Sequence, residues 1–497
     1  MLIMSYQYKA GISREQGMLL PPRVDEYVSE ENTVRAIDAS VESLDLGQLG
    51  FQYTVGGGGA GQPPFAPGTL LKLYMWGYLN RTRSSRRLEV ETFRNLEVIW
   101  LLHGLHPCYK TIAHFRKDNA AALKAVYKDF LLVCRELKLF GGELVGIDSM
   151  FLEGDASKAS IYTEKRLTTL LTRLDEKITA YLAALDQADQ DSQESPYEDE
   201  ALSETLQTLQ TRQRTYQGLL EELQASEDTQ ISCTDTDARR LTKKTDKGPT
   251  SGYNVQCAID SKYKLLAACD VVNDGNDSHQ LTSLALQAKE NLGVDELKAA
   301  ADTGYYAHQE LKDCEDAGIT VYVPEPDTGA ATRQHGRFPR EDFTYDPEAN
   351  VYRCPADKEL TVCGSRQQDG KKKFQYRSNV PVCAECPFRT QCVTEKSGYR
   401  TIYRWEHEAV VERHRQRMQE EGSRYMRLRA GLAEHPFGTL KVWCGWTHFL
   451  VRGFTKVRGE FHLLATCYNF KRALNILGIE AFRTYCQQRQ LLAFVLS

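Results

Sequence analysis

The stretch Leu144-Val145-Gly146-Ile147-Asp148-Ser149 is a short apolar run that ends on a carboxylate. Its length, and the glycine pair Gly141-Gly142 before it, predict a buried strand rather than a helix. A carboxylate at the end of a buried strand is costly unless it has a partner, and a metal ion is a common strong partner. An aspartate that only caps a turn gives the same local pattern, so the interpretation depends on the residues that follow.

The composition is that of a globular protein outside a membrane. The chain has 497 residues, of which 41% are hydrophobic and 26% are charged, and this length accommodates about two to four domains. No run approaches the ~20 apolar residues of a membrane span, and Met1–Arg14 lacks the pattern of a signal peptide, so we expect a cytoplasmic protein. The formal charge of -5 argues against a uniformly basic coat, so any contact with nucleic acid must come from local patches.

Residues 1–140 predict an all-helical domain. Ser29–Asn32 has the composition of a helix start, and the residues from Pro67 onward place apolar side chains at helical spacing. Residues 55–67 are rich in glycine and proline, which predicts a loop, and a nucleotide site is disfavoured because no Gly-Lys-Ser/Thr follows. Two basic edges either face solvent or contact a DNA backbone. They are formed by Arg81, Arg83, Arg86 and Arg87, and by His114, Arg116 and Lys117.

Residues 160–226 have a different pattern. Leucines recur three or four residues apart in two stretches, 167–185 and 202–223, and the polar stretch 187–200 separates them. This spacing predicts an antiparallel helical hairpin with coiled-coil packing. The hairpin carries no residue pattern suited to catalysis, so we expect a spacer or an interaction arm.

Residues 231–325 alternate between strand and helix patterns. Residues 253–260 and 265–272 predict a hairpin with its turn at Asp260–Lys262. A helix is expected over residues 279–292, then a strand over 297–301 that leads directly to Asp302, and a further strand over 319–323. This order predicts an α/β fold with a mixed sheet flanked by helices.

Asp148 and Asp302 have the same setting, each after an apolar strand and before a turn. If those strands are neighbours, both carboxylates can hold two divalent ions roughly 3.5–4 Å apart, which suits in-line displacement at a phosphodiester. Glu434 is the candidate third carboxylate, because it follows an arginine-rich stretch and precedes Lys441 by seven residues. Two helical turns would place Glu434 and Lys441 on one face. Pro436 complicates this geometry, since it either begins a new helix or ends one already running.

Cysteines cluster at positions 354, 363, 383, 386 and 392. Cys383 and Cys386 form a CxxC pair, and Cys354 and Cys392 would complete a tetrahedral zinc site, with Cys363 as a spare. A cysteine-rich loop without metal and an iron–sulfur cluster remain alternatives. We expect residues 326–399 to form a zinc-ribbon-like insertion that contacts DNA or a second subunit.

Five motifs in this order resemble those of bacterial insertion-sequence transposases of the DDE class, which have a ribonuclease-H-like catalytic core. The first is the N-terminal helical set, Pro67–Leu73, Ser84-Ser85-Arg86-Arg87-Leu88 and Thr111–Arg116. The others are Gly146-Ile147-Asp148, Gly252-Tyr253-Asn254-Val255-Gln256, Ala301-Asp302-Thr303-Gly304-Tyr305, and Glu434-His435-Pro436-Phe437-Gly438 through Lys441. The resemblance covers nearly the whole chain. Some relatives carry arginine where this chain has Ala430, so Arg427 or Arg429 must take that role here.

The resemblance implies a DNA transposase that holds two Mg²⁺ or Mn²⁺ ions on Asp148, Asp302 and Glu434, cuts the ends of its element and joins them to target DNA. It implies a DNA-binding and dimerisation domain at 1–140 and a catalytic core at 141–325 with 400–497, interrupted by the hairpin insertion at 160–226. The expected partners are double-stranded DNA and a second copy of the chain, in the bacterial cytoplasm at the nucleoid and without a membrane. The residues expected to contact DNA are Lys441, Arg427, Arg429, Arg86, Arg87 and Arg116.

Two other classes of function remain open at this point. One is a catalytically inactive, DNA-binding regulator derived from a transposase, against which the intact Asp148, Asp302 and Glu434 set argues. The other is a structural protein organised by zinc, in which those acids are incidental and Asp148→Asn changes nothing.

Overall fold

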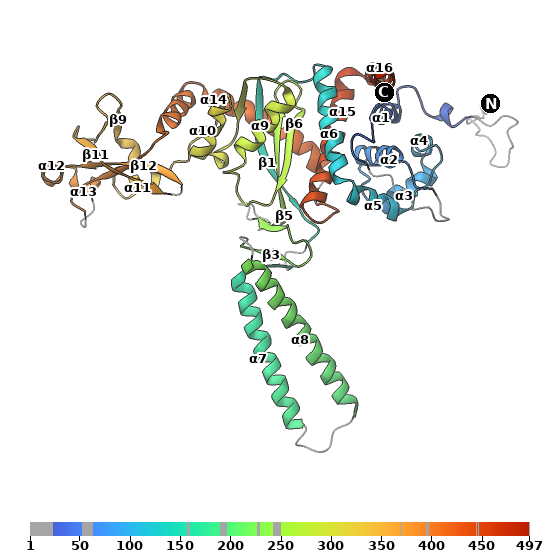
Figure 1. The fold of residues 1–497 in the computed structure, drawn as a ribbon, viewed down its shortest axis with the longest axis horizontal. Coiled ribbons are helices and arrows are strands. Elements are labelled where there is room, and N and C mark those ends of the chain that lie inside the picture. Colours follow the sequence, from blue (N-terminus) through green and yellow to red (C-terminus); the bar gives the residue numbers. More distant parts are fainter. Residues whose placement is uncertain are drawn as a thin grey trace, which may run out of the picture. The chain divides into compact units, whose positions relative to one another are not determined.

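The computed structural model describes residues 23–496 except 52–62, 157–159, 189–195, 226–228, 242–249, 369, 394–396, 444 and 446. Met1–Arg14 and most of the glycine-rich segment at 55–67 therefore lie outside the described residues. The chain divides into two compact units, Met1–Ala122 with Ala473–Ser497, and Leu123–Arg472. Figure 1 shows the fold and labels many of the elements of both units.

The first unit is helical throughout its described part, as predicted. Its helices are η1 (Val24–Tyr27), α1 (Thr33–Glu42), α2 (Pro67–Leu79), α3 (Ser85–Arg94), α4 (Leu96–Leu101), α5 (Tyr109–Asp118) and α16 (Ile479–Leu496). The predicted helix start is confirmed, because the Asn32 side chain accepts the backbone N–H of Val34 at 3.0 Å and so caps α1. α2 is buried along nearly its whole length and forms the core of this unit.

The second unit is built on a six-stranded mixed sheet. Its strands are β1 (Leu144–Glu153), β4 (Arg239–Leu241), β5 (Thr250–Asp260), β6 (Leu266–Val272), β7 (Leu297–Ala300) and β8 (Ile319–Tyr322). The order is β4-β5-β1-β7-β8, and β6 also pairs with β5. β1 runs antiparallel to β5 and parallel to β7, which is parallel to β8. The predicted α/β class, a ribonuclease-H-like mixed sheet, is confirmed.

Helices cover both faces of this sheet. They are α6 (Ala120–Glu136), α9 (Leu281–Leu292), α10 (His308–Asp316), α14 (Glu408–Gly438) and α15 (Phe454–Leu477). Val145 and Ile147 of β1 share a core with α9 and α10. Leu144 and Gly146, which alternate with them, face α14. Because side chains alternate along a strand, Asp148 belongs to the face that α14 covers.

Asp148 does not end its strand, and that part of the prediction is wrong. β1 continues to Glu153 because β5 pairs with it throughout, as far as Glu153 opposite Gly252. β7 pairs with β1 only as far as Gly146. Asp148 therefore lies in the middle of β1 but beyond the end of its parallel neighbour, where the carboxylate is only part-buried.

The region 160–226 forms the predicted helical hairpin. α7 (Glu164–Ala188) and α8 (Pro196–Ala225) pack against each other as two long helices (Figure 1). Leu167 and Leu223 are buried between them, together with Tyr162 and Ile231 from the short strands β2 (Ile161–Tyr162) and β3 (Ile231–Ser232). The polar stretch that connects the helices lies partly outside the described residues.

The cysteine-rich region contains a second sheet, antiparallel and five-stranded, in the order β13-β12-β11-β10-β9. Its strands are β9 (Thr344–Asp346), β10 (Val351–Arg353), β11 (Glu359–Gln368), β12 (Lys371–Ser378) and β13 (Thr401–Trp405), with the short helices α11 (Ala330–Gln334), α12 (Val380–Ala384) and α13 (Arg389–Cys392). A small core of Phe343, Tyr352, Leu360, Tyr376 and Ile402 holds it together. The sheet includes β13, so it leads directly into α14.

Candidate active site and cysteine cluster

Asp148 and Asp302 meet at one guanidinium group. The Nη2 atom of Arg429 on α14 lies 2.8 Å from Asp148 Oδ2 and 3.4 Å from Asp302 Oδ2. Asp148 approaches from β1, and Asp302 approaches from the turn that follows β7. Of the two arginines considered from the sequence, Arg429 therefore faces the aspartates, whereas the exposed Arg427 donates to the carbonyl of Ser423.

The backbone holds the second oxygen of each carboxylate. Asp148 Oδ1 accepts the N–H of Ser149 at 2.8 Å, and Asp302 Oδ1 accepts the N–H of Gly304 at 3.0 Å. Burial raises the pKa of Asp148, the Arg429 guanidinium opposes that rise, and the charge of Asp302 adds to it. A cation between two carboxylates that repel each other in this way stabilises both of their charged forms.

The donor set fits a hard divalent cation, because carboxylate oxygens are the ligands that Mg²⁺ and Mn²⁺ prefer. One oxygen of Asp148 and one of Asp302 already converge on a single positive group. Within the described part of the chain, no three His, Cys, Asp or Glu side chains are grouped closely enough to hold a metal ion. The two aspartates could therefore supply only part of a metal-ligand set.

Glu434 does not join the two aspartates in this structure. Arg429 faces them, and Leu432 packs on β1, where a Cβ added at Gly146 would lie 3.0 Å from Leu432 Cβ. Glu434 follows Leu432 by two positions, which is about 200° around a helix, and it is exposed. Lys441 is half-buried in a π-helical turn, η5 (Thr439–Trp443), that follows α14.

The expected spacing of two regular turns between Glu434 and Lys441 is therefore not met. α14 runs through Pro436 and ends at Gly438, after which the wider π-helical turn changes the register. Because Pro436 has no N–H, the last turn of α14 lacks one of its hydrogen bonds. The segment that carries Glu434 is thus the least regular part of the helix.

A polar network beside the aspartates includes residues that sequence analysis missed. Asp277, between β6 and α9, accepts hydrogen bonds from Asn254 and Gln256 of β5 and from Ser149 of β1. Asn254 and Gln256 belong to a motif noted in the sequence, but nothing in the motif assigned them a role. The sequence could have pointed to Asp277 only as an acid shortly after a predicted strand. Its hydrogen-bond partners lie too far away in the sequence to be predicted.

The basic residues expected to contact DNA in the first unit fall into two groups. Arg86 and Arg87 are exposed on α3, and the Arg86 guanidinium lies 5.2 Å from the centre of the Tyr109 ring. Arg116 is only 4% exposed, and its guanidinium lies against the Tyr74 ring inside the unit. Burial thus removes Arg116 from the surface that a DNA duplex could touch.

The cysteines predicted to bind zinc lie around one cavity of about 590 Å³ beside the second sheet. Burial raises the pKa of Cys392 to about 11, Arg400 opposes this, and the nearby thiols of Cys383, Cys354 and Cys386 add to it. The four thiols are thus close enough to influence one another's charge, but no three His, Cys, Asp or Glu side chains of the described residues are grouped closely enough here to hold a metal ion.

The backbone also contacts two cysteines that line this cavity. The Sγ of Cys354 accepts the backbone N–H of Lys358 at 3.3 Å, in a turn where Asp357 has a φ of 54°. Cys363, the spare cysteine, is exposed on β11 and bonds the carbonyl of Gln375 at 3.5 Å.

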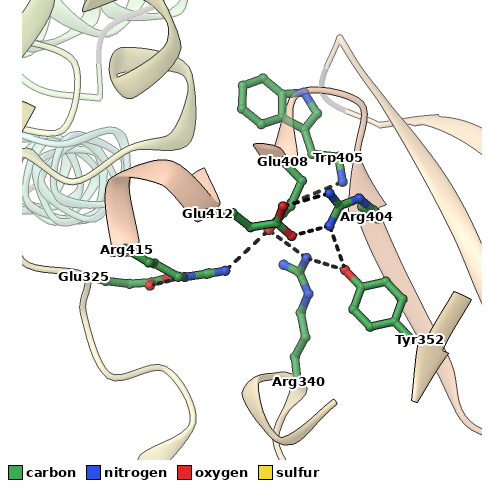
Figure 2. Close-up of polar contacts among 8 residues, drawn as sticks. All are labelled: Glu325, Arg340, Tyr352, Arg404, Trp405, Glu408, Glu412 and Arg415. Carbon is green, nitrogen blue, oxygen red and sulfur yellow. Dashed lines mark hydrogen bonds and ion pairs between the residues drawn. The ribbon is translucent and has the colours of Figure 1, made fainter. Parts of the chain in front are cut away.

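An ion-pair cluster joins the second sheet to α14 (Figure 2). The buried Glu408, at the start of α14, lies 2.8 Å from Arg340 and 3.8 Å from Arg415. Arg404 of β13 pairs with Glu412 of α14 through both of its terminal nitrogens. Because the same helix carries Arg429, the cluster fixes the cysteine-rich sheet to the helix that contacts the aspartates.

Comparison with protein families gives two matches. Residues 353–474 match a transposase DDE domain, and residues 22–118 match a transposase domain of the DUF772 type. The first covers most of the cysteine-rich sheet, α14 and most of α15, and the second covers α1 to α5. Both matches are to transposase domains, and a DDE domain indicates an enzyme of polynucleotidyl transfer.

Other comparisons add little to this identification. The piggyBac transposase, in a synaptic complex with hairpin DNA, matches with 9% identity and a TM-score of 0.31, over 92% of this chain and 77% of that chain. A likeness at that TM-score supports no conclusion, and no curated protein matches. Among the described residues, none of the helices combines the length and apolarity that crossing a membrane requires.

Proposed function

We propose that the chain cuts the ends of its own insertion sequence and joins them to target DNA at a site formed by Asp148, Asp302 and Glu434, with two Mg²⁺ or Mn²⁺ ions. The observation that carries this proposal is the convergence of Asp148 and Asp302 on the Arg429 guanidinium. The transposase matches support the active enzyme, and a catalytically inactive regulator is not favoured.

The chemistry of the site follows from its side chains. The carboxylates of Asp148 and Asp302 provide the negative charge that holds divalent ions. Such ions, when bound, lower the pKa of a water or a terminal 3′-hydroxyl and stabilise the leaving oxygen. Arg429 can pair with a phosphate oxygen of the strand that is cut, because its guanidinium lies beside both carboxylates.

Glu434 requires a local rearrangement to reach the aspartates. Its exposed position lies close to Pro436 and to the π-helical turn, so a rotation of the last turn of α14 disturbs few backbone hydrogen bonds. We propose that DNA binding drives this rotation and that Lys441 then contacts a phosphate. Glu434→Gln should abolish cleavage and leave DNA binding intact, whereas Glu420→Gln, at a non-buried position on the same helix, should cleave normally.

The remaining assignments concern partners. Arg86, Arg87 and Arg427 are exposed and are proposed to contact the DNA backbone, with residues 1–140 binding the element ends and forming a homodimer. Cys354, Cys383, Cys386 and Cys392 are proposed to bind a structural zinc ion. The catalytic core comprises 141–325 and 400–497 in this proposal, and the reaction takes place in the bacterial cytoplasm. Light scattering on the protein–DNA complex tests the dimer.

The decisive experiment is strand cleavage of a labelled element end, with and without Mn²⁺. Wild-type protein should cut in a metal-dependent way, and Asp302→Asn should bind the same DNA without cutting it. Asp313→Asn is a matched control, because the Asp313 side chain accepts a hydrogen bond from Gln309 on its own helix. Failure of the wild-type protein to cut or join any element end with either metal would refute the proposal.

A further inference from the structure

Asp277 accepts three side-chain hydrogen bonds beside the two aspartates. Its Oδ1 accepts from Asn254 Nδ2 at 2.7 Å and from Gln256 Nε2 at 2.6 Å. Its Oδ2 accepts from Ser149 Oγ at 3.1 Å. With both oxygens occupied, Asp277 is suited to holding other residues in place rather than to binding a metal ion itself.

The donors to Asp277 are rigidly placed. Gln256 lies opposite Ser149 in the pairing of β5 with β1, and Asn254 lies two residues before Gln256 on the same face of β5. Both amides are almost completely buried. A charged acceptor between two buried amides makes strong hydrogen bonds, because little water competes for them.

The network continues to the other aspartate through Tyr305. The Tyr305 hydroxyl donates to Gln256 Oε1, and the ring is fully buried. Burial raises the pKa of Tyr305 well above its usual value, and the charge of Asp277 adds to the rise, so the hydroxyl stays protonated as a donor. Tyr305 ends the short turn η3 (Thr303–Tyr305), which Asp302 caps by accepting the N–H of Gly304.

A continuous path therefore runs from Ser149, next to Asp148, through Asp277 and Gln256 to the turn that Asp302 begins. The backbone pairing of β1 with β7 stops at Gly146, before either aspartate. Beyond that point the ladder no longer fixes the distance between the two strand ends. The side-chain path bridges this gap.

We propose that Asp277 is a positioning residue that sets the separation of the Asp148 and Asp302 carboxylates through Ser149, Gln256 and Tyr305, and thereby sets the affinity of the site for a divalent metal ion. The inference rests on the proposed function, because it presupposes that the two aspartates bind metal.

The test measures Mn²⁺ binding to the full chain without DNA, by electron paramagnetic resonance of free Mn²⁺. Loss of a group that orients metal ligands weakens binding by about ten- to hundred-fold, and this is the expected effect of Asp277→Ala. Asp274→Ala is the matched control in the same loop, because the Asp274 side chain is exposed and bonds Gln280 rather than a strand. The control should bind Mn²⁺ as the wild type does.

Tyr305→Phe is the second variant, and it keeps the buried ring while removing one link of the path. It should weaken Mn²⁺ binding by about tenfold, and excess Mn²⁺ should restore DNA cleavage. A purely structural role predicts a different result, namely a lower melting temperature with unchanged Mn²⁺ affinity for both Asp277→Ala and Tyr305→Phe, and that result overturns the proposal.

Two aspartate variants separate this inference from the function on which it rests. If Asp148→Asn and Asp302→Asn weaken Mn²⁺ binding while Asp277→Ala and Tyr305→Phe do not, only the positioning role fails. If neither aspartate variant changes Mn²⁺ binding, the metal site itself fails and the positioning role fails with it.

Discussion

Gly146→Ala tests whether α14 is held at the distance from β1 that the site requires. A Cβ at this position would lie 3.0 Å from Leu432 Cβ and 3.1 Å from Leu432 Cδ1, where ordinary contact begins near 3.4 Å. The helix must therefore move away by about 0.4 Å, since the atoms at this contact repel steeply at shorter range. Overpacking of this kind costs about 1–3 kcal/mol of unfolding free energy.

The same shift moves Arg429 relative to Asp148, so we also expect cleavage to fall by about tenfold. Unfolding is followed by circular dichroism in urea, and activity by cleavage of a labelled element end. Gly431→Ala is the control on α14, because no atom lies within 4 Å of its added Cβ. It should stabilise the protein by about 0.5–1 kcal/mol, since alanine loses less backbone entropy than glycine.

A second substitution makes the reasoning refutable. Leu432→Ala alone costs about 2–5 kcal/mol, because Leu432 is buried. Alanine keeps the Cβ at 3.0 Å but removes the Cδ1 contact at 3.1 Å, so Gly146→Ala combined with Leu432→Ala should cost less than the sum of the two single changes, by about 0.5 kcal/mol or more. Strict additivity would show that the two positions do not meet and would refute the packing argument.

Three further predictions follow from the charges and thiols of the structure. Because the pKa of Asp148 is raised in the fold, its ionisation destabilises the metal-free fold as the pH rises above the ordinary pKa of 3.8. Metal-free Asp148→Asn should therefore melt at a higher temperature than wild type at pH 7, and this difference in melting temperature should vanish below pH 3.8. Cys383→Ser should lower the zinc content measured by plasma mass spectrometry, whereas Cys363→Ser should not, and equal zinc in both would contradict the assigned ligands. Glu408→Gln leaves the charge of Arg340 uncompensated and should cost about 1–3 kcal/mol in urea unfolding, and an unchanged midpoint would argue against the ion-pair cluster.

Periodic segments of this chain are predictable because their signal is local. The leucine spacing over residues 160–226 specifies two helices that bury one stripe each, and α7 with α8 form that hairpin. The Asn32 cap and the buried strand beginning at Leu144 are also visible in the sequence, since capping and apolar patterning involve neighbouring residues. The order of strands and helices over residues 231–325 is enough to predict a mixed sheet.

Features that depend on distant partners are not predictable in this way. β1 extends past Asp148 because residues about a hundred positions later pair with it. The sequence predicts that Arg116 is a charge on the surface, but the packing of α2 against α5 buries it. The roles of Asn254 and Gln256 appear only when Asp277 is folded against them.

The sequence by itself determined which residue types this protein has for its chemistry: two aspartates that follow apolar runs, a glutamate in a basic segment and a cluster of thiols. Hydrophobic periodicity and motif order depend only on neighbours along the chain, so they carry that information. The tertiary structure decided which of these groups meet. Asp148 and Asp302 come together at Arg429 because β1, β7 and α14 pack side by side, whereas Glu434 faces outward because Leu432 occupies the helix face that the sheet buries.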